Sequence, residues 1–147
     1  MRVAIAADHN GVELKEHLIN TLVAAGHLVE DLGTNGTAVV DYPALCVAAC
    51  SRVTGGTADV GIVVGGSGQG EVIACNKLPG IRAGLAYSRF AVEISRGNND
   101  ANVMVLGAKV VTPEEADELL DAWLATQFKG GVHAERIAQI NALEQRH

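Results

Sequence analysis

The sequence predicts an open, parallel α/β sheet covered by helices on both faces, and three observations support this. Short apolar runs alternate with helical patterns along the whole chain. The apolar runs are continuous rather than alternating in polarity, which is typical of strands covered on both sides. The chain has 147 residues, of which 48% are hydrophobic, enough for a substantial core. We therefore expect a single domain over residues 1–147.

Five segments are predicted to be strands. Four of them are continuously apolar, namely residues 3–7, 60–64, 83–87 and 103–106. The fifth, residues 27–32, is more polar, which suits a strand at the edge of the sheet. Helical patterns separate these segments, so parallel strands can be joined by right-handed crossovers.

Six helices are predicted between and after the strands. The first carries an apolar stripe over residues 14–23 and ends near Gly26. The next three are expected over about 42–53, from the 65–71 turn to about 77, and over about 89–96. The last begins near His133 and carries Ile137, Ile140 and Leu143.

The fifth helix has the clearest start. Thr112 suits the N-cap, Pro113 the first helical position, and Glu115 the closing position of a capping box. Leu119, Leu120, Trp123 and Leu124 would then form its buried face.

Composition argues against several classes of function. The net charge is −6 and no basic run is present, which argues against non-specific nucleic-acid binding. No apolar run approaches the roughly 20 residues of a membrane span, and residues 3–7 are too few for a signal core. Cys46, Cys50 and Cys75 suggest neither a disulfide framework nor a zinc site. We expect a cytoplasmic protein without a bound metal.

The strongest local pattern is Gly65-Gly66-Ser67-Gly68-Gln69-Gly70-Glu71, between a buried strand and a helix. Ligands bind beyond the carboxyl ends of strands in such sheets. Closely spaced glycines let backbone N–H groups face an anion near a helix N-terminus. The pattern is neither a Walker loop nor a convincing dinucleotide fingerprint, and a tight strand–helix turn is the simpler alternative.

Several polar residues near the strand ends have both a structural and a functional interpretation. Glu71 would either match the helix dipole or act as a general base beside the glycine loop. Asp8 and His9 follow the first strand, where they would cap a helix or face the crevice. The other candidates are Tyr42, Asn98, Asn99, Lys109, His133 and Arg136, for which a helix end or a solvated charge is the simpler alternative.

Together these segments resemble the family of ribose-5-phosphate isomerase B and galactose-6-phosphate isomerase over nearly the whole chain. The matching segments, in order, are Ala7-Asp8-His9, Asp31-Leu32-Gly33-Thr34, Asp41-Tyr42-Pro43, Gly66-Ser67-Gly68-Gln69-Gly70, Asn76-Lys77 with Gly80-Ile81-Arg82-Ala83, Asn99-Asp100-Ala101-Asn102-Val103, Gly107, Val110-Val111, and Gly130-Gly131 to Arg136. The resemblance implies a Rossmann-like three-layer sandwich with a five-stranded parallel sheet. It also implies a homodimer or dimer of dimers with interfacial active sites, and no metal or organic cofactor.

The chemistry implied by the resemblance is aldose–ketose isomerisation of a small phosphorylated sugar through a cis-enediolate. One branch of the family uses a cysteine at the position of Gly65 as base, and the other uses a glutamate at the position of Glu71. Glu71 is therefore the expected base. The resemblance implies further site residues as follows: Ser67, Asn99 and the N–H groups around Gly66, Gly68 and Gly70 at the reacting end, Asp8 at the sugar hydroxyls, Tyr42 in the pocket lining, and His9, Lys109, His133 and Arg136 near the phosphate.

Three positions depart from the family pattern. Asn98 stands where members acting on ring-forming sugars commonly have a histidine that helps to open the ring, and an amide cannot act as an acid or base. Val132 and Lys109 stand where arginines are common. Ribose 5-phosphate, converted to ribulose 5-phosphate in the pentose phosphate pathway, is the first expectation for the substrate.

Other substrates and functions stay open. A tetrose 4-phosphate cannot close a furanose ring, so erythrose 4-phosphate and erythrulose 4-phosphate are an alternative, and a hexose 6-phosphate is a weaker one. A non-catalytic nucleotide-binding module or an inactive partner subunit would use the same strand ends. The retained Glu71, Asp8 and Asn99 favour an active enzyme.

Overall fold

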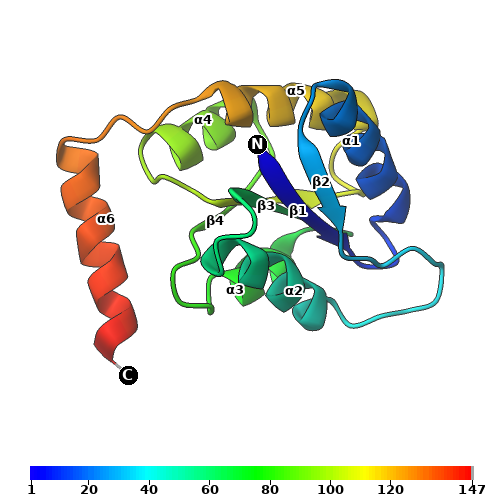
Figure 1. The fold of residues 1–147 in the computed structure, drawn as a ribbon, viewed down its shortest axis with the longest axis horizontal. Helices are drawn as coiled ribbons and strands as arrows, with labels where there is room; N and C mark the ends of the chain where they lie inside the picture. The colour runs from blue at the N-terminus through cyan, green and yellow to red at the C-terminus, as the bar shows by residue number, and fades with distance from the viewer. Residues whose placement is uncertain (147) are drawn as a thin grey trace.

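The computed structural model describes residues 1–146 and contains one five-stranded parallel sheet in the order β2-β1-β3-β5-β4 (Figure 1). The strands are β1 (Arg2–Ala7), β2 (Leu28–Asp31), β3 (Val60–Gly65), β4 (Ala83–Leu85) and β5 (Val103–Gly107). The predicted α/β class is therefore confirmed, and the polar strand β2 lies at an edge as expected. Strand β4 ends two residues earlier than predicted, and Ser88 caps the next helix by accepting a hydrogen bond from the Ala91 N–H.

Helices cover both faces of this sheet, which gives three layers (Figure 1). The helices are α1 (Val12–Ala24), α2 (Tyr42–Thr54), α3 (Gln69–Cys75), α4 (Arg89–Gly97), α5 (Pro113–Ala125) and α6 (Val132–Leu143), followed by a short 3₁₀ turn (Glu144–Arg146). One face is covered by α1, α4 and α5, and the other by α2 and α3 (Figure 1). None of these helices, within residues 1–146, combines the length and the apolar character that crossing a bilayer requires.

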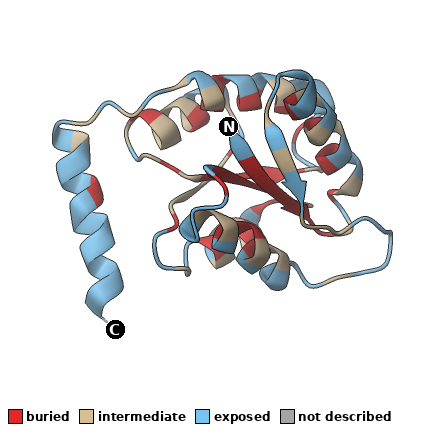
Figure 2. Ribbon diagram, in the orientation of Figure 1, coloured by how far each residue is buried: buried red, intermediate tan, exposed pale blue. Residues whose placement is uncertain are grey.

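Side chains of the central strands point alternately into two hydrophobic cores. Ile5 and Ile62 pack with α1 and α5, where Trp123 is fully buried. Ala6 and Val63 point to the other face, where Cys46, Cys50 and Cys75 are buried with them. Figure 2 shows the resulting buried sheet between helices with exposed outer faces. The three cysteines are free, buried thiols.

Helix α5 starts as predicted. The Thr112 hydroxyl accepts a hydrogen bond from the Glu115 N–H at 3.1 Å, and the Glu115 carboxylate accepts one from the Thr112 N–H at 2.8 Å. This reciprocal capping box satisfies two N–H groups that a helix end leaves unpaired.

Helix α6 stands apart from the sheet and its covering helices (Figures 1 and 2). Ile137 is its only residue classed as buried, whereas Val132, Ile140 and Leu143 are exposed apolar side chains. The turn after α6 is tied to the body by a hydrogen bond from the Gly80 N–H to the Glu144 carboxylate at 2.9 Å.

Candidate active site

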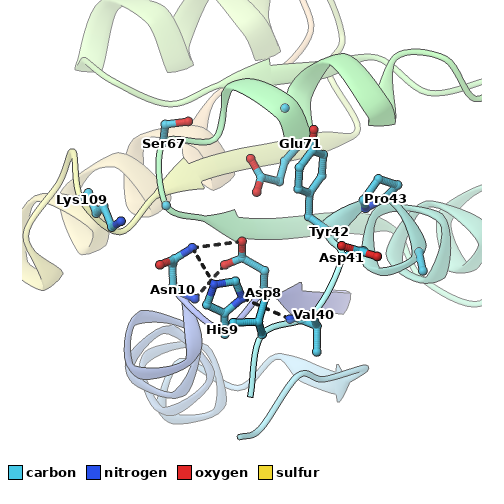
Figure 3. Close-up of a pocket in the computed structure, with 14 residues that line it drawn as sticks. Asp8, His9, Asn10, Val40, Asp41, Tyr42, Pro43, Ser67, Glu71 and Lys109 are labelled. Atoms are coloured by element: carbon cyan, nitrogen blue, oxygen red, sulfur yellow. Dashed lines mark hydrogen bonds between the residues drawn. The ribbon is translucent and has the colours of Figure 1, made fainter. Parts of the chain in front are cut away.

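A cavity of about 950 Å³ opens beyond the carboxyl ends of β1 and β3 (Figure 3). This is the edge of a parallel α/β sheet at which ligands bind. The residues that line it come from the turns after β1, β3 and β5 and from the segment before and within α2: Asp8, His9, Asn10, Val39, Val40, Asp41, Tyr42, Pro43, Ala44, Gly66, Ser67, Gly70, Glu71 and Lys109.

The glycine loop after β3 brings Glu71 back over the end of its own strand. Gly68 takes a left-handed conformation, with φ of 81°, and begins α3. The Ser67 hydroxyl accepts a hydrogen bond from the Gln69 N–H at 3.2 Å, which fixes the Ser67 side chain. A Cβ on residue 65 would overlap the Glu71 carboxylate, so the chain needs glycine at position 65 to admit this carboxylate.

Glu71 is a buried carboxylate that faces the cavity (Figure 3). Its pKa is raised above the ordinary value, chiefly because burial disfavours the charged form. Its own backbone N–H opposes the rise, and the negative charge of Asp8 adds to it. A carboxyl group with a raised pKa is a stronger base than an exposed glutamate, which suits proton abstraction from carbon.

Asp8 is also buried, at 5% exposure, and lies opposite Glu71 across the cavity (Figure 3). Its Oδ1 accepts a hydrogen bond from the Asn10 backbone N–H at 2.9 Å, and its Oδ2 accepts one from the Asn10 side-chain amide at 3.3 Å. Asp8 can therefore accept hydrogen bonds from the hydroxyls of a bound ligand.

His9 points into the same cavity, and the Val40 N–H donates to its Nδ1 at 3.3 Å. The other ring nitrogen, Nε2, lies 3.4 Å from the side-chain amide nitrogen of Asn10. His9 is thus held at the cavity by contacts at both ring nitrogens.

The segment that carries Val40, Asp41 and Tyr42 into the site is anchored by a buried lysine. Lys15 on α1 is fully buried, and its Nζ donates to Asp31 Oδ1 at 2.6 Å and to Asn35 Oδ1 at 2.5 Å. Neither Lys15 nor Asn10 was predicted as a site residue from the sequence. The signal for Lys15 is a cation on the apolar side of a helix. The signal for Asn10 is its place two residues after Asp8, where an aspartate side chain commonly accepts from the backbone N–H.

The single chain gathers eight of the predicted site residues at this cavity. They are Asp8, His9, Tyr42, Gly66, Ser67, Gly70, Glu71 and Lys109. Gly68 belongs to the same loop. The other four, Asn98, Asn99, His133 and Arg136, lie elsewhere: Asn98 caps the end of α4, Asn99 follows it, and His133 and Arg136 lie in the first half of α6.

Asn99 lines a second cavity, of about 610 Å³, with Arg82 and the end of α6. The loop that holds it is firmly braced. The Arg82 guanidinium donates to the carbonyl oxygen of Asn99 at 3.1 Å and to that of Asp100 at 2.8 and 3.0 Å. The Asn98 amide oxygen accepts a hydrogen bond from Lys129 Nζ at 3.0 Å. These residues are thus presented on a fixed loop, but not to the Glu71 of their own chain.

Comparison with known proteins agrees with the fold and with the resemblance seen in the sequence. The family model for Ribose/Galactose Isomerase matches residues 3–140. Ribose-5-phosphate isomerase B of Escherichia coli is 40% identical over 145 residues, which cover 99% of this chain and 97% of that protein. The structure of ribose-5-phosphate isomerase B from Clostridium thermocellum has a TM-score of 0.98 and 40% identity, and covers 99% of both chains.

A third relative carries a ligand. The structure of ribose-5-phosphate isomerase B from Mycoplasma genitalium with bound ribulose-5-phosphate has a TM-score of 0.95 and 32% identity, with 99% of this chain and 97% of that chain covered. The resemblance seen in the sequence is confirmed by these matches along nearly all of the chain. The chain belongs to the ribose/galactose isomerase family and is an aldose–ketose isomerase.

Proposed function

We propose that this enzyme interconverts ribose 5-phosphate and ribulose 5-phosphate through a cis-enediolate, with Glu71 as the base. One observation supports Glu71 as the base: its carboxylate fills the space that a side chain on residue 65 would occupy. A cysteine at position 65 and a glutamate at position 71 would therefore present their reactive atoms to the same part of the cavity. Relatives named ribose-5-phosphate isomerase B support the choice of substrate.

The reaction requires a proton to move between neighbouring carbons. Glu71 takes the proton from C2 of the open-chain aldose and returns it to C1, while a proton moves from the C2 hydroxyl to the C1 oxygen. The enediolate oxygen that gains negative charge accepts hydrogen bonds from Ser67 and from the backbone N–H groups of Gly66, Gly68 and Gly70. Asp8 accepts hydrogen bonds from the other sugar hydroxyls. His9 and Lys109 bind the phosphate, which offsets the net charge of −6.

The site is completed, in this proposal, by a second copy of the chain. Asn99, His133 and Arg136 lie away from the Glu71 of their own chain, next to the exposed apolar residues Ile140 and Leu143 of α6. A two-fold homodimer would cover these apolar side chains and bring Asn99 to the partner's cavity. A dimer of dimers would preserve the same arrangement.

Glu71→Gln tests the base directly, because the amide keeps the shape but cannot take a proton. We expect kcat on ribose 5-phosphate to fall by about 10³-fold, within the range for a lost general base, while the sugar phosphate still binds. Isomerisation at the wild-type rate by this variant would eliminate Glu71 as the base.

Mixed dimers test the interfacial site. Glu71→Gln and Asn99→Ala should each be nearly inactive alone, but a heterodimer of the two has one site with both native residues. Random re-association of equal amounts should restore about a quarter of the wild-type activity, because half of the dimers are mixed and each has one intact site of two. Absence of any recovery, with mixed dimers shown by mass spectrometry, would place both residues in one chain's site.

A tetrose 4-phosphate is the second candidate substrate, and Asn98 is the observation that favours it. Its amide can neither take nor give a proton, and its oxygen is already bonded to Lys129. Erythrose 4-phosphate and erythrulose 4-phosphate need no ring opening, because phosphate blocks the oxygen that would close a furanose. A higher kcat/KM for erythrulose 4-phosphate than for ribose 5-phosphate would identify the tetrose 4-phosphate as the preferred substrate.

A further inference from the structure

The orientation of the Asp8 carboxylate depends on one neighbouring residue. In the described part of the chain, both donors to this carboxylate come from Asn10: the backbone N–H at 2.9 Å from Oδ1 and the side-chain Nδ2 at 3.3 Å from Oδ2. The side-chain torsion that turns a carboxylate plane has only a weak intrinsic preference. A single bond to Oδ1 would therefore leave the plane of the carboxylate free to turn, and the second bond fixes it.

The position of Asn10 suits this role. Its side chain lies between His9 and the Ser67 loop at the floor of the cavity (Figure 3). It also sits over Gly66, where an added Cβ would stand 3.3 Å from Nδ2 and would push against the amide. The amide therefore packs closely against residue 66, so that the turn after β1 contacts the glycine loop after β3.

We propose that Asn10 is a positioning residue for catalysis, whose amide holds the Asp8 carboxylate in the plane that receives the sugar hydroxyls. This inference rests on the proposed function, because it assumes that Asp8 meets the substrate. Asn10 supplies the only side-chain donor to Asp8 among residues 1–146, so a side chain without an N–H or O–H group at this position leaves Oδ2 without its partner.

Two substitutions separate the contributions of shape and of the donor. Asn10→Ala removes the amide and leaves the backbone bond to Oδ1. Asn10→Asp keeps the shape, but replaces the donor with a carboxylate at about the same distance from Oδ2, so that two negative charges face each other. Repulsion then turns the Asp8 carboxylate away, and the loss should exceed that of the alanine variant.

The experiment is steady-state isomerisation of ribose 5-phosphate and of erythrulose 4-phosphate by wild type, Asn10→Ala and Asn10→Asp. We expect kcat to fall about tenfold in the alanine variant, as for one lost hydrogen bond to a charged group, with KM changed less than kcat. In the aspartate variant we expect a fall of about 100-fold, as for a misplaced catalytic group. Asn20→Ala, an exposed asparagine on α1, is the matched control and should behave as wild type.

A double-variant cycle with Asp8→Asn decides whether Asn10 acts through Asp8. If it does, Asn10→Ala adds little to the loss in Asp8→Asn, because the group that it positions is already disabled. Fully additive losses, or a wild-type kcat in Asn10→Ala, would overturn the inference. A wild type that isomerises neither sugar phosphate would instead contradict the proposed function, so the two failures are distinguishable.

Discussion

Gly65→Ala is the sharpest probe of the site, because it adds one methyl group where Glu71 now lies. The new Cβ would stand 2.6 Å from Oε2 and closer to the other two carboxylate atoms, whereas ordinary Cβ contacts begin at 3.4 Å. The carboxylate must therefore retreat by at least 0.8 Å at Oε2 (3.4 − 2.6) and by more at Oε1. A displacement of about 1 Å in a catalytic group can lower the rate about 100-fold, so we expect a loss of that size in kcat.

The backbone should tolerate this change, because the atoms that must move are the far end of a flexible side chain. We therefore expect a melting temperature close to wild type, measured beside the kinetics. Gly36→Ala is the matched control, since a Cβ at this loop position meets nothing within 4 Å. An unchanged kcat in Gly65→Ala would refute the placement of the reactive carboxylate against residue 65.

Because a side chain at residue 65 would occupy the space of the Glu71 carboxylate, the reactive group can be moved from position 71 to position 65. Glu71→Ala removes the carboxylate and leaves room at residue 65, so adding Gly65→Cys puts a thiol where the carboxylate was. We expect the double variant to be faster than Glu71→Ala alone, and most clearly at alkaline pH, because the thiolate is the basic form. A double variant no faster than the single one would show that the two positions do not serve the same part of the substrate.

Three further predictions follow from the electrostatics and bracing of the site. Because the pKa of Glu71 is raised, the folded state keeps the proton of this carboxyl group to higher pH than the unfolded chain does. The free energy of unfolding therefore falls as pH rises from the unfolded pKa through the folded one. Glu71→Gln should raise the melting temperature relative to wild type at pH 8 but not at pH 4. Asp31→Asn leaves the fully buried Lys15 ammonium without its carboxylate partner and should cost about 3 kcal/mol in urea unfolding, whereas the exposed control Asp121→Asn on α5 should cost almost nothing. Arg82→Ala removes the hydrogen bonds to the carbonyl oxygens of Asn99 and Asp100 and should lower kcat/KM about tenfold. The control Arg89→Ala removes only an exposed ion pair with Glu93 and should leave kcat/KM unchanged.

Most of the secondary structure follows from local patterns. Continuous apolar runs identify β1, β3 and β5 because these strands are covered on both faces, and the Thr112–Glu115 box defines the start of α5 within a single helical turn. The tight turn at the glycine loop was likewise predictable, since closely spaced glycines allow the left-handed conformation that Gly68 takes where α3 begins. Each of these signals arises from residues close together in the chain, so the sequence alone determines them.

The tertiary structure decides which of these residues meet. Only folding brings Asp8, just after the first strand, opposite Glu71 of the third helix, and only folding shows that Asn99 and Arg136 lie away from that cavity within one chain. The role of Lys15 depends on Asp31 and Asn35, which are distant in the chain, and the bond from the Asn10 side chain to Asp8 depends on a rotamer that the sequence does not specify. Such contacts depend on the order of strands and on burial, which come from the packing of the whole chain rather than from any local pattern.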